Sequence, residues 1–238
     1  MTYNIYHGER SNEPGKSNLK DIANIINQVK PDFVALQEVD SITNRSATFN
    51  DSVPQNLVKE LAELTNMYSF FGKAIDYGNG GYGEGILSRF PASASTVILP
   101  IPKGGELRAL ISVGHTFPNG QEIIFAGTHL CHQFAENRLA QTDSICNIFS
   151  DAEIPVIMGG DFNFNPDSES YKLIRTCFND AAEMEGKPQN TIPSDNPRAR
   201  IDYIFVSKKH NWTIKEVKVI RSEASDHLPV LVTLELKE

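Results

Sequence analysis

The chain has 238 residues and a formal net charge of −8 at pH 7, with 40% hydrophobic and 22% charged residues. This composition is ordinary for a globular protein, and the length suffices for one large domain or two small ones. The acidic balance excludes the basic surface on which many nucleic-acid-binding proteins rely, although a bound metal ion can supply positive charge instead. No apolar run reaches 18 residues, so the sequence predicts no transmembrane helix.

The first part of the chain alternates between strand and helix. Residues 2–6 are typical of a short strand, and residues 17–30 of a helix, because the apolar positions recur every three or four residues. Ser17 is the expected N-cap of that helix. An apolar run at 32–39 predicts a buried strand, and a second helix is expected at 54–66, with a proline at its start.

The central part is rich in strands. Five short runs of β-branched and aromatic residues are separated by Gly, Pro and Asn, which predicts strands joined by turns. These runs cover residues 67–75, 83–90, 94–100, 107–117 and 121–130. A helix at 133–149, a buried strand at 153–163 and a short helix at 168–178 follow. The last three predicted strands cover residues 200–207, 213–221 and 228–236.

This order of elements predicts the fold class. Because no low-complexity tract or Ser/Gly-rich linker interrupts the chain, we interpret residues 1–238 as a single domain. Each half proceeds from alternating elements to a run of strands, and two mixed β-sheets packed face to face, with helices outside, would bury the apolar strand faces. We therefore predict an α/β four-layer sandwich. A doubly wound single sheet is the less favoured alternative, because the strand runs resemble antiparallel meanders.

The cysteines give little guidance about redox state. Cys131, Cys146 and Cys177 are odd in number, widely spaced and without a C-x-x-C pair, so we expect three buried thiols and no disulfide. Cys131 stands between His129 and His132, which suggests zinc, but a fourth ligand is missing. The chain starts directly on a strand-like segment without a signal peptide. We therefore expect either a cytosolic protein or an exported one from which an N-terminal segment has been removed, and the sequence favours neither.

Polar side chains gather at the starts and ends of the predicted strands. They are Asn4, Glu38, His129, Asp161, Asn163, Asp202, Asp226 and His227. Because strands of a packed sheet end along common edges, these residues can converge although they are far apart in sequence. In "GGDFNFNP", strand alternation would send Asp161 and Asn163 to one side and Phe162 and Phe164 to the buried side.

Converging carboxylates require a compensating charge. Glu38, Asp161, Asp202 and Asp226 in one pocket would repel one another unless a cation offsets them. Oxygen ligands without a cysteine pair favour Mg²⁺, with Mn²⁺ possible, over Zn²⁺. Taken singly, each motif has a plainer alternative: a turn or helix cap, a surface ion pair or a core histidine. The eight residues stand at six different strand starts or ends, and this repetition within one chain favours a common site.

Seven strings occur in an order that is known from one superfamily. They are TYNI, LQEVD, GILSRFP, GTHL, GGDFN, RIDYIFVS and SDHLPV. The order resembles the endonuclease/exonuclease/phosphatase superfamily, which includes pancreatic-type deoxyribonuclease, abasic-site endonucleases, neutral sphingomyelinases and inositol-polyphosphate 5-phosphatases. The resemblance runs from Thr2 to the last strand, and the fuller pattern is similar to compact bacterial members. It implies a four-layer sandwich and Mg²⁺-dependent hydrolysis of a phosphate ester.

The same resemblance implies roles for the metal and water ligands. Glu38 is expected to be the main metal ligand, supported by Asn4, with Asp226 as a further ligand or a neighbouring carboxylate. Asp161 would orient or deprotonate the attacking water, acting mainly by alignment because a carboxylate is a weak base. Asn163 would position the water or a phosphate oxygen.

Histidines are the expected donors to the phosphate. The resemblance implies that His227, charged and held by Asp202, donates to the phosphate, and that His129 is the second phosphate-facing histidine. A charged donor stabilises the extra negative charge of the transition state. Further candidates for substrate contacts are Arg108, Arg138, Glu84 and Tyr82. For Arg138 a solvated helix face is the favoured interpretation. Arg108 and Glu84 are candidates to contact phosphate or to orient a histidine, but a structural role is favoured for both.

The substrate is predicted only by class. Abasic-site enzymes carry an Asp two residues after the Asn, where this chain has Tyr6, which argues against a DNA-repair role. The acidic surface and short loops favour a small phosphodiester, a sugar phosphate or a phospholipid headgroup. A nuclease acting on DNA or RNA is the alternative, so nucleic acid is a possible but not favoured partner. A non-catalytic binding module is a further alternative, and an unrelated histidine-rich di-metal hydrolase is disfavoured because no H-x-H or H-E-x-x-H occurs. We expect a monomer.

Overall fold

The computed structural model describes residues 1–237. Its strands are β1 (Thr2–Asn4), β2 (Phe33–Ser41), β3 (Tyr68–Tyr77), β4 (Gly80–Ser88), β5 (Ser93–Leu99), β6 (Arg108–Thr116), β7 (Glu122–His129), β8 (Val156–Asp161), β9 (Phe178–Asp180), β10 (Asp202–Ser207), β11 (Asn211–Val219) and β12 (Val230–Lys237). Its helices are the 3₁₀ turn η1 (Tyr6–Gly8), α1 (Leu19–Val29), α2 (Asn44–Thr48), α3 (Leu57–Thr65), α4 (Ala135–Phe149), α5 (Glu169–Cys177) and α6 (Ala181–Glu185). No helix within residues 1–237 combines the length and apolarity needed to cross a bilayer.

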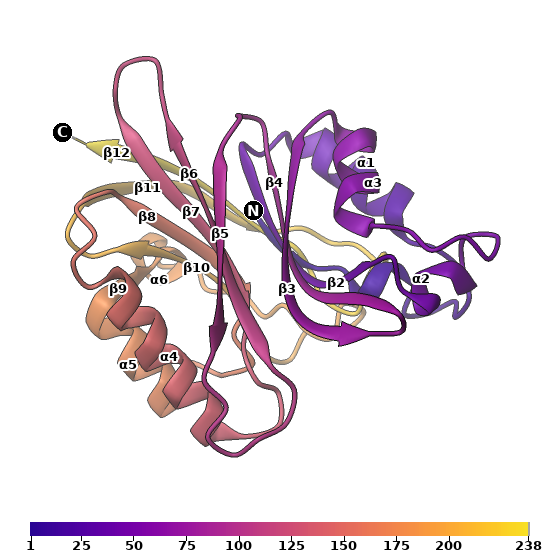
Figure 1. The fold of residues 1–238 in the computed structure, drawn as a ribbon. Helices are drawn as coiled ribbons and strands as arrows, with labels where there is room; N and C mark the ends of the chain where they lie inside the picture. The colour runs from indigo at the N-terminus through magenta and orange to yellow at the C-terminus, as the bar shows by residue number, and fades with distance from the viewer. Residues whose placement is uncertain (238) are drawn as a thin grey trace.

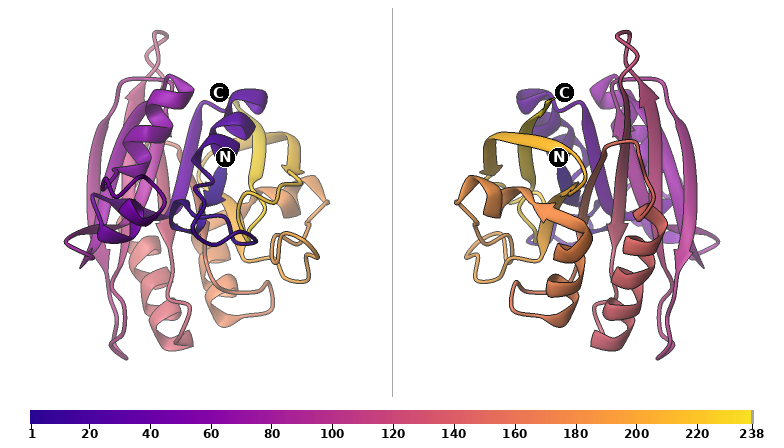
Figure 2. Two further views of the ribbon diagram at one scale, coloured as in Figure 1. Left: turned by 90° about the vertical axis from the view of Figure 1, so that its right-hand side faces the viewer. Right: turned by 90° about the vertical axis from the view of Figure 1, so that its left-hand side faces the viewer.

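The strands form two six-stranded mixed sheets. The first has the order β11-β12-β1-β2-β4-β3 and the second β5-β6-β7-β8-β10-β9. Figure 1 shows α1 and α3 beside the first sheet and α4 and α5 beside the second. The turned views of Figure 2 show α4 and α5 lying side by side along the second sheet. The predicted α/β four-layer sandwich is therefore confirmed.

Three clusters of buried apolar side chains fill the spaces between the four layers. One joins α1 and α3 to the first sheet and includes Ile22 and Leu36. The second lies between the sheets and includes Ala35, and the third joins α4 and α5 to the second sheet and includes Met158. Leu36 and Ala35 belong to different clusters because successive side chains of a strand point to opposite faces.

The two sheets approach each other closely where β1 crosses β8. A Cβ atom added at Gly159 would lie 2.9 Å from the Cβ atom of Thr2, so only glycine fits at this position. Two residues further along each strand stand Asn4 and Asp161. The close crossing therefore brings these two side chains together from different sheets.

Two helix starts differ from the prediction. α3 begins at Leu57 after its N-cap Asn56, so Pro54 precedes the helix and is not at its start. The first helix has Asn18 as its N-cap residue, not Ser17, and begins at Leu19. The Asn18 amide donates to the carbonyls of Ile5, Glu9 and Ala224. Asn18 thus ties together three segments near the strand ends. The short elements α2, α6 and β9 were not predicted, because their three to five residues are too few to show a period.

One prediction about the cysteines is wrong. Cys146 and Cys177 form a disulfide, with Cα atoms 5.9 Å apart, whereas Cys131 is a free, buried thiol. The bond links α4 to the last residue of α5. Only the packing of these two helices brings the cysteines together, and spacing along the sequence carries no sign of it.

Candidate active site

The strand register of the second sheet assembles one side of the site. β7 and β8 run parallel and pair His129 with Asp161, and β8 and β10 run antiparallel and pair Asp202 with Asp161. All three side chains are buried. Asp161 therefore lies between a histidine and a second carboxylate on its two neighbouring strands.

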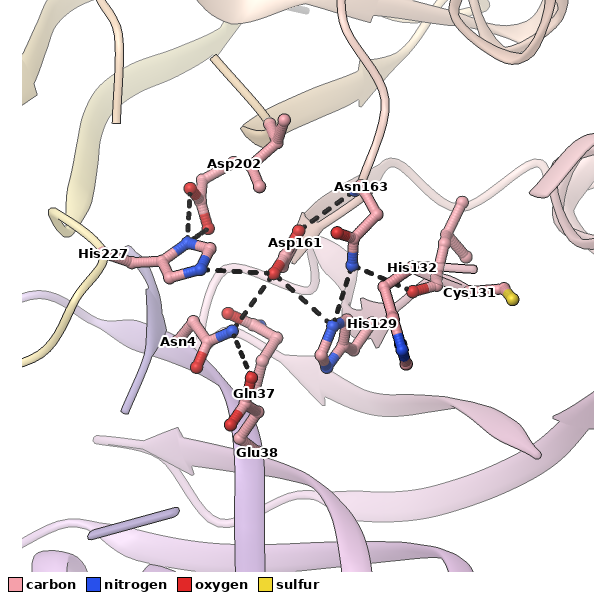
Figure 3. A network of polar contacts seen from close by, with 12 residues as sticks. Asn4, Gln37, Glu38, His129, Cys131, His132, Asp161, Asn163, Asp202 and His227 are labelled. Atoms are coloured by element: carbon pink, nitrogen blue, oxygen red, sulfur yellow. Dashed lines mark hydrogen bonds and ion pairs between the residues drawn. The ribbon is translucent and has the colours of Figure 1, made fainter. Parts of the chain in front are cut away.

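The first sheet supplies Asn4 and Glu38 (Figure 3). The Nδ2 atom of Asn4 donates to Oε1 of Glu38 and to Oδ2 of Asp161, both at 3.1 Å. Glu38 has φ = 59° beside an irregularity in the β2–β4 ladder, which turns its side chain toward this contact. The Oδ1 atom of Asn4 accepts from the backbone N–H of Tyr6. The amide nitrogen of Asn4 thus bridges two carboxylates, while its amide oxygen is bound to the backbone of Tyr6.

Glu38 is held in its ionised form. Burial would raise its pKa, but contacts with His7 and Asn4 and the nearby imidazoles lower the pKa to about 2. The His7 ring lies 3.6 Å from Glu38, and its other nitrogen contacts Glu9 at 3.1 Å. Sequence reasoning missed His7, although it stands two residues after the quoted string TYNI, because no spacing rule connects it to Glu38.

Asp161 is less readily ionised. Burial, together with the charge of Asp202, raises its pKa to about 7, although His227 and hydrogen bonds from Asn4 and Asn163 act in the opposite direction. Its Oδ2 atom lies 3.4 Å from Nε2 of His129 and 3.7 Å from Nε2 of His227. Two imidazole nitrogens therefore converge on one carboxylate oxygen.

His227 and Asp202 form a buried pair. Nδ1 of His227 donates to Oδ2 of Asp202 at 2.9 Å, and Thr191 donates to the same carboxylate. Burial lowers the pKa of His227, but the charges of Asp202 and Asp161 outweigh it and raise the pKa to about 10. His227 is therefore a cation at neutral pH, as the sequence predicts from its partner. Thr191 comes from a loop without a recognisable motif and was missed.

His129, unlike the positively charged His227, is a neutral histidine. Burial and the nearby Arg108 guanidinium lower its pKa, so the ring is neutral. Arg108 donates from Nη1 to Nδ1 of His129 at 3.0 Å. Because a guanidinium can only donate, Nδ1 is the acceptor and the proton of the neutral ring lies on Nε2, toward Asp161.

Asn163 reaches the site through a turn. β8 ends at Asp161, and the backbone N–H of Asn163 donates to Oδ1 of Asp161 at 3.0 Å. Asn163 has φ = 50°, a conformation that Asn tolerates better than most residues. Phe162 and Phe164 are buried as expected. The expected division of side chains is observed, but a local Asx-type turn produces it and not an extended strand.

The acidic residues fit a hard cation. Asp161, Asp202 and His227 have ligand atoms within 4.8 Å of one another, but His227 is already occupied by its Asp202 hydrogen bond. Asp226 is affected by the same group of charges. Burial raises the pKa of Asp226, and the negative charge of Glu38 raises it further. Four carboxylates thus face one cationic histidine, and Glu38 remains ionised. Excess negative charge on oxygen donors is what Mg²⁺ or Mn²⁺ would offset.

The four candidate substrate residues lie in different environments. Arg108, Glu84 and Tyr82 are buried behind the site, and Oε2 of Glu84 and Nε of Arg108 have no hydrogen-bond partner within residues 1–237. Burial raises the pKa of Glu84 well above its usual value, although the charge of Arg108 opposes this. Arg138 lies on α4 and donates to the backbone carbonyls of Cys131 and His132, so its side chain holds the adjacent loop.

Ser225 is a further residue that the sequence did not indicate. Its hydroxyl donates to the carbonyl of Asn4 at 2.8 Å and lies 3.2 Å from Oδ1 of Asp226, and the N–H of His227 donates to it. It connects the "SDH" segment to β1. Ser225 is the first residue of the quoted string SDHLPV, so its place in that string could have indicated it.

A family profile confirms what the strand-end residues suggest. The profile of the endonuclease/exonuclease/phosphatase family matches residues 1–227. The chain belongs to this family. Members of the endonuclease/exonuclease/phosphatase family hydrolyse phosphoric esters and generally depend on divalent metals, so this chain is a phosphoric ester hydrolase. A comparison with curated proteins finds no match to the chain at the sequence level.

Solved structures share the fold over nearly the whole chain. A functionally unknown conserved protein from Enterococcus faecalis is 20% identical, with a TM-score of 0.81, over 99% of this chain and 98% of its own. The mannosyl-6-phosphatase of Bacteroides thetaiotaomicron is 17% identical, with a TM-score of 0.78, over 98% of each chain. The human nocturnin catalytic domain with a bound sulfate anion is 22% identical, with a TM-score of 0.76, over 99% of this chain and 92% of its own. At these identities the likeness concerns the fold.

Proposed function

We propose that this member of the endonuclease/exonuclease/phosphatase family is a Mg²⁺-dependent phosphodiesterase. The observation that carries the proposal is the position of Asp161. Asn4 links it to the ionised Glu38 on one side, and the cationic His227 faces it on the other. A carboxylate set between a metal ligand and a charged donor has the surroundings needed to align a water against phosphorus.

Glu38 and Asp226 are the residues that would hold the metal ion. Glu38 is ionised, and Asp226 is half-buried with Ser225 at one oxygen. Asn4 would act by orienting Glu38, since its oxygen accepts from Tyr6. When bound, Mg²⁺, or Mn²⁺ in its place, supplies Lewis-acid polarisation of the phosphate and of the attacking water.

The protein groups would do the positioning and proton work. Asp161 accepts a hydrogen bond from the attacking water and sets its direction toward phosphorus. His227 donates from Nε2 to a phosphate oxygen, and its charge, maintained by Asp202, stabilises the transition state.

His129 and Asn163 form a second group of donors. Nε2 of His129 carries a proton, and Nδ2 of Asn163 lies only 2.9 Å from it while also donating to the carbonyl of Leu130. With its proton on Nε2, His129 cannot accept from Asn163, so this contact joins two donors and lacks an acceptor. A phosphate oxygen would accept from both, so we assign this point to a non-bridging oxygen of the substrate.

The proposed substrates are a small phosphodiester, a sugar phosphate or a phospholipid headgroup. The net charge of −8 would repel a long polyanion outside the reach of the metal. One solved neighbour is named as a mannosyl-6-phosphatase, which supports a sugar phosphate as a candidate. Short DNA or RNA is the alternative.

A substrate panel with metal control tests the proposal. The wild-type chain would be assayed on bis(4-nitrophenyl) phosphate, 4-nitrophenyl phosphate, glycerophosphodiesters, sugar phosphates, sphingomyelin, phosphoinositides, plasmid DNA and abasic-site DNA, each with Mg²⁺ or EDTA. We expect hydrolysis with Mg²⁺ only, faster on small diesters than on DNA, and none by His227→Ala. Equal activity in EDTA would overturn the metal assignment, and preference for DNA would support the nuclease alternative.

A further inference from the structure

Arg108 contacts two histidines at once. It is a buried side chain that donates from Nη1 to Nδ1 of His129 and from Nη2 to Nδ1 of His132, each at 3.0 Å. A guanidinium has no acceptor, so both Nδ1 atoms accept. A neutral imidazole that accepts at Nδ1 carries its proton at Nε2. One buried arginine therefore fixes the same tautomer in both rings.

His132 is exposed to solvent but held in place. Arg138 donates to the carbonyls of Cys131 and His132 at 2.9 and 3.2 Å, and the N–H of Cys131 donates to the buried Gln141 at 2.9 Å. With the ring fixed by Arg108, both the backbone and the side chain are restrained. An exposed side chain loses rotamer entropy when it is restrained in this way and gains no apolar burial in return. Such an arrangement is expected at a recognition surface.

The loop that carries His132 adjoins the end of β8. The N–H of Leu130 donates to the carbonyl of Asp161 at 2.9 Å, which joins this loop to the end of β8. Figure 3 shows His132 next to His129, on the side away from His227. Its Nε2–H is therefore a donor at the rim, past the point assigned to the phosphate.

We propose that His132 is a substrate-binding residue that donates from Nε2 to an oxygen of the alcohol esterified to the phosphate. Arg108 is the positioning residue that presets His129 and His132 as Nε2–H donors. The inference rests on the proposed function, and it identifies the chain's preference as esters whose alcohol carries an oxygen acceptor, such as glycerol or a sugar.

The first experiment needs no substrate. In protein with ¹⁵N-labelled histidine, we expect His129 and His132 to show a protonated Nε2 and an unprotonated Nδ1 near neutral pH. Arg108→Met, which keeps the apolar length, and Arg108→Lys, which keeps one donor in case the first variant folds poorly, should mix the tautomers in both rings. A protonated Nδ1 in the wild type, or an unchanged tautomer in both variants, would overturn the role of Arg108.

The second experiment compares two esters. For a glycerophosphodiester we expect His132→Ala to raise KM about tenfold with a smaller change in kcat, which is the loss of one hydrogen bond. His132→Gln, which retains an N–H donor, should recover part of the loss. The loss should be smaller on bis(4-nitrophenyl) phosphate, whose aryl groups carry oxygen only in nitro groups at the far end of each ring. His210→Ala, at the distant β10–β11 turn, is the matched control.

The results separate the two proposals. An equal fall in kcat on both esters, or no effect of His132→Ala on either, would overturn the role of His132. If the wild type hydrolyses neither ester, the proposed function fails, and binding of glycerol 1-phosphate then decides the inference. We expect its Kd to rise about tenfold in His132→Ala and not in His210→Ala, and an unchanged Kd would contradict the inference.

Discussion

The Nε2 atom of His227 lies 3.7 Å from Oδ2 of Asp161, which is too far for a hydrogen bond and close enough for attraction between opposite charges. The other ring nitrogen of His227 is bound to Asp202. Within residues 1–237, Nε2 makes no hydrogen bond. The Nε2–H of the positively charged ring therefore lacks an acceptor and can donate to a ligand. A phosphate oxygen is the acceptor that this position suits.

Replacing His227 tests that interpretation. His227→Ala should lower kcat/KM by roughly 10²–10⁴-fold, the usual contribution of a positioned acid–base group. His227→Gln, which keeps a donor without the charge, should lose nearly as much. Circular dichroism would confirm the fold, and His210→Ala, at the half-buried His210 of the β10–β11 turn, serves as the control. Full activity in either His227 variant would remove the residue from the mechanism.

The stability of metal-free protein should depend on pH through His227. Its pKa is raised to about 10 in the folded state, so its stabilising contribution is complete below pH 6.5, its ordinary pKa, and is lost as the pH rises toward 10. Urea unfolding in EDTA between pH 6.5 and 10 should show this decline. Asp202→Asn should weaken it, because the first charge that raises the His227 pKa is gone.

Asp161 should lower the stability of the metal-free protein. Burial raises its pKa from 3.8 to about 7, so ionisation is disfavoured in the folded state. The destabilisation therefore grows as the pH rises from 3.8 to about 7 and is complete above that pH. We expect Asp161→Asn to increase the free energy of unfolding at pH 8 in EDTA by roughly 1–3 kcal/mol while abolishing hydrolysis. Below pH 4 the two proteins should converge, which provides an internal control.

Mg²⁺ should stabilise the folded protein through Glu38. At a concentration about 100-fold above Kd, binding contributes about 2.7 kcal/mol, which corresponds to a rise of roughly 5–10 °C in Tm for a chain of this size. Glu38→Gln should remove most of the shift, and Glu223→Gln, on an exposed loop, should not. A shift that persists in Glu38→Gln would place the ion elsewhere.

The disulfide between Cys146 and Cys177 should contribute to stability. The bond joins residues separated by 31 positions, and closing such a loop stabilises a protein by about 3.7 kcal/mol in the chain-entropy model. Cys146→Ser should therefore lower the free energy of unfolding by about that amount under oxidising conditions and match the reduced wild type. Equal stability of wild type and variant without reductant would contradict a formed bond.

Much of the fold and of the site can be predicted from the sequence. The reason is that residues next to apolar runs in the sequence also become neighbours when those runs pair as strands. Asp161 and Asp202 are each next to an apolar run, and antiparallel pairing of those runs makes them direct neighbours. The period of the apolar residues gave α1 and α3, and the meander of short strands gave the sheet arrangement. In these places a local signal and the tertiary contact agree.

The remainder depends on contacts that no local pattern encodes. Thr191 reaches Asp202 from a loop, and Asn18 was identified only as part of a helix start, although its amide joins three segments. The cysteine pair requires α4 to pack on α5. Arg108 had several open roles in sequence, and only the positions of the two imidazoles define its hydrogen bonds.

The measurement closest to the central claim is hydrolysis of bis(4-nitrophenyl) phosphate by wild type and Asp161→Asn, each with Mg²⁺ and with EDTA. Asp161 lies between Asn4 and His227 and is assigned to align the attacking water. We predict turnover by the wild type with Mg²⁺ only, and none by Asp161→Asn under either condition although it folds. Turnover by folded Asp161→Asn at the wild-type rate would contradict the account.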